Sequence, residues 1–207
     1  MSKTRTILAY ELTGQDDDSY MLGEETFEPA SAPGDWRFGR EGLPHPATCT
    51  VCGGKIDAGY VNPQYRVKKR RRDLTATYDG YLLASARLCG VLKENGAAPA
   101  DFVALPADPG YFWLRPKAVL SYSAEECLRR CDSCGQFADA VVPVPLFLAQ
   151  LAQPLSPGVY RSSMEFGSVP LKSFGVVIGE STGASLESAA LKGVELRPLH
   201  AWRDGDA

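Results

Sequence analysis

The chain carries the same five-residue pattern twice, and this repeat constrains the fold more than any other feature of the sequence. The two copies are Cys49-Thr-Val-Cys-Gly53 and Cys131-Asp-Ser-Cys-Gly135. Two thiols separated by two residues can bind one metal ion, and the glycine that follows lets the turn adopt a positive φ. Backbone N–H groups can then point at the sulfur atoms. We therefore expect one tetrahedral four-sulfur site holding a structural zinc ion, with Cys49, Cys52, Cys131 and Cys134 as ligands.

Two other interpretations of these thiols stay open. The pairs are separated by roughly eighty residues, against about 15–20 in a compact zinc ribbon, so they can also be reduced thiols without metal. A redox role is the second alternative, because a CxxC pair at a helix start can carry a reactive thiolate. Gly53-Gly54 disfavours that role, since an active dithiol would open a helix there. Cys127 and His45 lie near the two motifs and are candidate replacement ligands.

Length and composition predict a soluble protein with a proper core. The chain has 207 residues, 44% of them hydrophobic, and a net charge of −3, so no global field marks a nucleic-acid or membrane binder. No run approaches the ~18 apolar residues of a spanning helix, and no apolar signal region opens the chain. Six cysteines, four of them in CxxC pairs, fit a reducing compartment. We expect one bacterial, cytoplasmic domain over 1–207 that contacts no membrane.

A weak internal repeat predicts two strand–helix–strand units. The first has strands at 81–85 and 101–106 around a helix at 86–95, and the second has strands at 175–179 and 194–199 around a helix at 182–191. Ser85 and Ser181 stand where an N-cap belongs, and Gly96 and Gly193 follow the helices. The strands of each unit are expected to pair in parallel through a right-handed crossover. The predicted fold class is α+β, a mixed sheet pinned by the pair of zinc knuckles.

One run of charge, Lys68 to Arg72, offers a nucleic-acid interface. Its basic groups could contact phosphates, and Tyr65, Tyr78 and Tyr81 could supply stacking. We favour a simpler interpretation, a solvated segment that enters a strand, and one half of an electrostatic protein interface is a further alternative. The sequence contains no P-loop, no G-x-S-x-G elbow, no G-x-G-x-x-G after a strand and no H-E-x-x-H motif. We therefore do not expect an enzyme.

The two CxxCG motifs, together with the closing segment from Phe174-Gly-Val-Val-Ile178 to Leu191-Lys-Gly-Val-Glu-Leu-Arg-Pro198, resemble the double-CxxCG family of small proteins from swarming soil bacteria. The resemblance covers most of the chain from about Trp36 onward, and its specific parts are the two motifs and the tail. Several members of that family are taken to be immunity proteins that neutralise a toxin delivered by sibling cells.

The resemblance implies a non-catalytic zinc-binding protein that occludes a cognate bacterial toxin without turnover. Exposed aromatic and arginine side chains would then carry the binding energy. The candidates are Arg70, Arg71, Arg72, Trp113, Trp36, Tyr111 and Trp202. The alternative function is a zinc-ribbon-like nucleic-acid-binding module that uses the basic run at 68–72.

Overall fold

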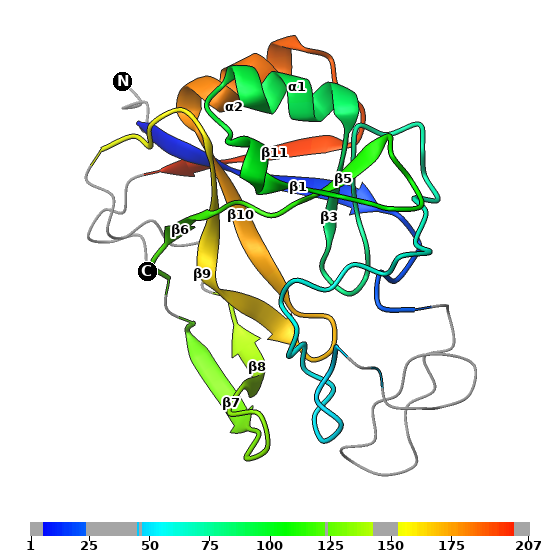
Figure 1. Cartoon of the computed structure of the whole chain (residues 1–207). Helices are drawn as coiled ribbons and strands as arrows, with labels where there is room; N and C mark the ends of the chain where they lie inside the picture. Colours follow the sequence, from blue (N-terminus) through cyan, green and yellow to red (C-terminus); the bar gives the residue numbers. More distant parts are fainter. Residues whose placement is uncertain (1–5, 24–44, 46, 123, 143–152, 201–207) are drawn as a thin grey trace.

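The computed structural model describes residues 6–23, 45, 47–122, 124–142 and 153–200, and within them eleven strands form one mixed sheet. Two helices, α1 (Ala86–Glu94) and α2 (Glu180–Ser188), lie side by side over one face of it (Figure 1). The strands are β1 (Ile7–Asp16), β2 (Leu74–Ala76), β3 (Leu82–Ser85), β4 (Phe102–Ala104), β5 (Tyr111–Leu114), β6 (Ala118–Leu120), β7 (Glu126–Arg130), β8 (Phe137–Val141), β9 (Val159–Ser168), β10 (Ser173–Gly179) and β11 (Val194–His200). A 3-10 turn, η1 (Pro99–Asp101), precedes β4. The expected mixed sheet with few helices is confirmed.

The sheet runs in the order β4-β5-β3-β2-β1-β10-β9-β8-β7, with β11 added on β1 and β6 added on β9. The long strand β1 joins its two halves. Residues 9–11 of β1 pair with β10, residues 7–14 pair antiparallel with β11, and residues 15–16 pair in parallel with β2. The hairpin of β7 and β8 extends the sheet beyond β9. In Figure 1 this hairpin lies at the end of the molecule opposite the helices.

The expected direct parallel pairing within each strand–helix–strand unit is wrong. Strands β3 and β4 both pair antiparallel with β5, which lies between them. Strands β10 and β11 both pair antiparallel with β1, which lies between them in the same way. The strands flanking each helix are therefore parallel in direction but separated by a third strand. In each case that third strand comes from outside the local unit, so the local pattern could not reveal it.

The helix ends agree with the sequence in the first unit and differ in the second. Ser85 is the N-cap of α1, and its hydroxyl accepts a hydrogen bond from the amide of Leu88 at 3.2 Å. Helix α2 begins two residues earlier than expected, with Gly179 as its N-cap, so Ser181 lies inside the first turn. The expected N-cap at Ser181 is wrong, because the β10 strand passes directly into the helix at Gly179.

Side chains alternate between two buried layers, as the two-residue period of a strand requires. On the helix side, Ala84 of β3 and Ile178 of β10 pack with Leu88 of α1 and Leu186 of α2. On the other side, the neighbouring Leu83 packs with Tyr81 and Trp113 under loops at 20–22 and 60–67, while Val177 packs with Phe166 and Leu199. The sheet is therefore covered by apolar layers on both faces.

Neither described helix is long and apolar enough to cross a membrane.

Candidate metal centre

The two CxxCG motifs fold into two equivalent turns, which we call the first knuckle (49–54) and the second knuckle (131–136). In each knuckle the amide of the glycine donates to the carbonyl of the first cysteine at 2.8 Å, and the amide of that cysteine donates to the carbonyl of the sixth residue, also at 2.8 Å. Gly53 and Gly135 have φ of 74° and 73°, as the sequence predicts. The second knuckle forms the turn between β7 and β8, and a bridge between Thr48 and Lys55 closes the first.

The structure brings the four expected thiols into one cluster, with all four Sγ atoms within 4.8 Å of one another. The Sγ atoms of Cys49 and Cys131 are 3.9 Å apart, and those of Cys52 and Cys134 are 3.6 Å apart. Four sulfurs at about 2.3 Å from a tetrahedral metal would be about 3.8 Å from one another. The cluster therefore has the dimensions of a four-thiolate metal site and can hold a metal ion.

Backbone amides make the cluster a good host for thiolates. The amide of Gly54 donates to Sγ of Cys52 at 3.4 Å. Burial acts to raise the pKa of Cys49, but hydrogen bonds from the amides of Cys52 and Val51 and from neighbouring thiols outweigh it, so this pKa falls to about 6. Burial, together with those thiols, raises the pKa of Cys52 to about 12. One thiol thus ionises readily while a neighbour keeps its proton, and a bound cation would favour ionisation of the others.

The other ligand candidates do not belong to this cluster. Cys127 lies on β7 against the apolar layer that contains Phe166. His45 is buried, Nδ1 accepts a hydrogen bond from the amide of Ala47 at 3.1 Å, and its ring meets Tyr60 edge-on. Burial lowers the pKa of His45. This histidine is therefore a buried side chain that lies outside the thiol cluster.

The basic run is largely committed to contacts within the protein. The carboxylate of Asp17, fully buried, accepts hydrogen bonds from the amides of Lys68 and Lys69 at 3.0 and 2.7 Å. Four of the basic side chains also have partners. Lys69 and Arg70 pair with the carboxylates of Asp18 and Asp108, and Lys68 and Arg72 donate to the carbonyl oxygens of Asp18 and Asp16. Arg71 makes no hydrogen bond or ion pair with the described residues. Two of the five charges are thus paired with carboxylates, and two more of these side chains are held against the protein by hydrogen bonds.

The aromatic partner-binding candidates that the structure describes lie in the core. Trp113 is 7% exposed, and its ring lies 4.7 Å from that of Tyr81. Tyr111 is equally buried, and its hydroxyl lies 2.7 and 2.9 Å from the carbonyl oxygens of Arg70 and Arg72. Both rings therefore offer little surface to a partner. Trp36 and Trp202 lie outside the described residues.

Exposed apolar side chains that the sequence did not single out lie around the knuckles instead. Val51 is in the first knuckle and Ile56 follows it, and they are 50% and 53% exposed. Phe137, next to the second knuckle, and Leu171, in the turn between β9 and β10, are also exposed. The Lys172 ammonium binds the carbonyl of Phe137, so this turn adjoins the second knuckle. The sequence alone does not distinguish these residues from buried apolar ones, because their exposure depends on the tertiary fold.

Comparison of the chain with models of known protein families gives no match, and comparison with curated proteins gives none either. The similarity to the double-CxxCG proteins thus rests on the two motifs and the closing segment alone, and membership of that family stays a prediction.

Proposed function

We propose that the protein is a non-catalytic zinc-binding protein that binds and neutralises a bacterial toxin. The observation that carries the metal assignment is the cluster of four Sγ atoms within 4.8 Å. Four thiolates fill a tetrahedral site and leave no position for water, which favours a structural over a catalytic metal. All-sulfur tetrahedral sites hold zinc or iron, and zinc is the metal that we propose. No helix directly follows either motif, which disfavours a dithiol redox role.

Metal analysis of the purified protein tests the first half of the proposal. We expect about one zinc per chain, lost in Cys134→Ser because three thiolates bind the ion far less tightly. Cys127→Ser is the matched control, since Cys127 is also half-buried and lies only seven residues away on the same hairpin. Wild-type protein that is folded and contains no metal would refute the assignment, and iron would show itself by its visible absorption.

The second half of the proposal, binding of a toxin, is supported by the apolar side chains around the knuckles. Four such side chains are exposed: Val51, Ile56, Phe137 and Leu171. The segments that carry them are held together by the four-thiol cluster and by the hydrogen bond from Lys172 to the carbonyl of Phe137. Exposed apolar groups on a rigid support are typical of protein-binding surfaces. Four of the five basic side chains at 68–72 are held by contacts within the protein, so a nucleic-acid partner is the weaker alternative.

An affinity pull-down from the native lysate, carried out with and without nuclease, distinguishes these partners. We expect one dominant protein that stays bound at high salt, is toxic when produced alone, and is silenced at a one-to-one ratio. Ile56→Ser with Phe137→Ser should abolish its retention, whereas Val119→Ser, an equally exposed apolar change on β6, should not. Recovery of nucleic acid that disappears with nuclease or salt would contradict the toxin proposal and favour the nucleic-acid-binding alternative.

A further inference from the structure

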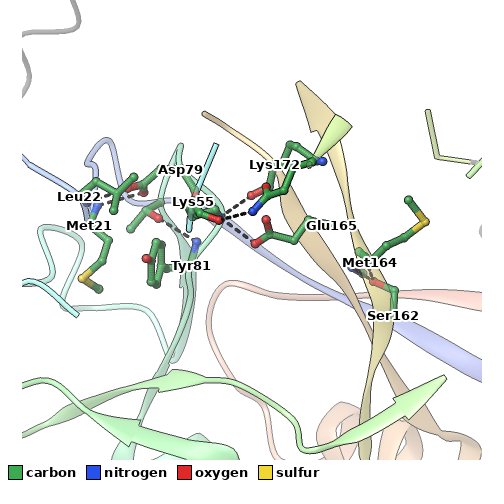
Figure 2. Close-up of polar contacts among 12 residues, drawn as sticks. Met21, Leu22, Lys55, Asp79, Tyr81, Ser162, Met164, Glu165 and Lys172 are labelled. Carbon is green, nitrogen blue, oxygen red and sulfur yellow. Dashed lines mark hydrogen bonds and ion pairs between the residues drawn. The ribbon is translucent and has the colours of Figure 1, made fainter. Parts of the chain in front are cut away.

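Lys55, the residue that directly follows the first knuckle, has a buried side chain that connects this knuckle to the sheet (Figure 2). The ammonium of Lys55 donates to the carbonyl oxygens of Asp79 at 2.9 Å and of Lys172 at 2.6 Å, and it pairs with the carboxylate of Glu165 at 2.9 Å. An ammonium has three N–H donors, and each has a partner here. The side chain is 7% exposed, so losing these partners would leave an unpaired buried charge. Lys55 is therefore fixed relative to β9 and the turn at 172.

A second buried lysine does the same for the second knuckle. The ammonium of Lys172 donates to the carbonyl of Phe137, the residue after the second knuckle, at 2.9 Å. The side-chain amide of Gln136 donates to the carbonyl of Lys55 at 2.7 Å. Because Gln136 and Phe137 are neighbours, three hydrogen bonds form a closed ring through residues 55, 172 and 136–137. This ring joins the two knuckles without using any thiol.

The ring acts on the residues that close the two knuckles. The carbonyl of Gly54 accepts the amide of Cys49, and the carbonyl of Gln136 accepts the amide of Cys131. Lys55 directly follows Gly54, and Gln136 belongs to the ring itself. Fixing these positions therefore fixes the backbone from which both cysteine pairs project.

We propose that Lys55, Gln136 and Lys172 are positioning residues of the metal site, which hold the two knuckles in register before the metal binds. The proposal rests on the proposed metal binding. Prearranged ligands spend less binding free energy on ordering the chain, so the ring raises metal affinity although none of its atoms contacts the metal. Groups that orient metal ligands from outside typically account for about 10- to 100-fold in affinity.

Zinc affinity, measured by competition with a chromophoric chelator, tests this role in Gln136→Met and Lys172→Met. Each change keeps the length of the side chain and removes one donor of the ring. We expect zinc to bind at least about 10-fold more weakly in both variants, and the thiolate-to-cobalt absorption of the cobalt-loaded protein to change shape. Ser85→Ala is the control for stability alone. It removes the N-cap hydroxyl of α1, which binds Leu88 and Asp73 and none of the described residues of the ring or the knuckles. The zinc affinity of this variant should stay within twofold of wild type.

The outcomes separate this proposal from the proposed function. Wild-type protein that binds neither zinc nor cobalt would refute the metal assignment and the positioning role together. Wild type that binds tightly, with both methionine variants within twofold of it and an unchanged cobalt spectrum, would refute the positioning role alone. Gln136 is only half-buried, so Gln136→Met decides the matter even where Lys172→Met does not fold.

Discussion

Two glycines, each near the middle of a helix, have different surroundings. Gly90 lies within α1, and a Cβ added there would meet no atom within 4 Å. Gly183 lies within α2, and a Cβ added there would lie 2.4 and 2.6 Å from two carbons of the Tyr10 ring. Gly90 thus lowers the helix propensity of α1 although packing does not require a glycine there. Gly183, in contrast, lets α2 approach β1 closely.

Gly90→Ala and Gly183→Ala are therefore expected to change stability with opposite signs. Gly90→Ala should raise the free energy of unfolding by about 0.5–1 kcal/mol, because alanine loses less backbone entropy in a helix. Gly183→Ala gains the same propensity but forces the Tyr10 ring aside at a cost of about 1–3 kcal/mol, so it should lower stability. Urea unfolding measures both values. In a Tyr10→Ala background the penalty at residue 183 should vanish, and an undiminished penalty there would contradict the steric explanation.

Among the elements, those set by local signals could be predicted, and those set by pairing could not. Strand β3 and helix α1 follow from the apolar run after Tyr81 and the cap at Ser85, and both stand where the sequence places them. Strand β1 continues through the polar residues Gln15 and Asp16 because these two residues pair with β2, and such pairing leaves no local sign in the sequence. The sequence does not predict the ten-residue strand β9, because its apolar alternation is weak and it is stabilised by pairing with β10 across a turn.

The candidate site divides in the same way. Each CxxCG motif contains its own pair of ligands and its own turn glycine, so five consecutive residues suffice to predict half of the thiol cluster. The prediction that the two pairs of cysteines lie together depends on a further assumption, namely that they share one metal ion. The ring through Lys55, Gln136 and Lys172 cannot be predicted from the sequence. An isolated lysine is usually a surface residue, and the ring joins three segments that are far apart along the chain.

For the whole molecule, the thiol cluster joins segments that the chain alone separates widely. Strands β2 to β7 all lie between the two knuckles, so a metal ion there would close a loop of roughly eighty residues. By the chain-entropy model, a crosslink over such a loop stabilises the folded state by about 4–5 kcal/mol. The apolar layer beneath α1 and α2 contains none of the four cysteines. The crosslink and this layer are therefore two separable sources of stability.

Removal of the metal by a chelator should lower the free energy of unfolding by up to about 4–5 kcal/mol and loosen the molecule unevenly. Hydrogen exchange should accelerate at residues 47–57 and in the β7–β8 hairpin, because these segments lose their crosslink. Exchange in β1, β10 and α1 should change little, since they surround the apolar layer on the helix side. Mass spectrometry of the deuterated protein, with Cys127→Ser as a metal-retaining control, measures this pattern. Equal loss of protection in α1 and at the knuckles would instead mean that the metal is required for the entire fold.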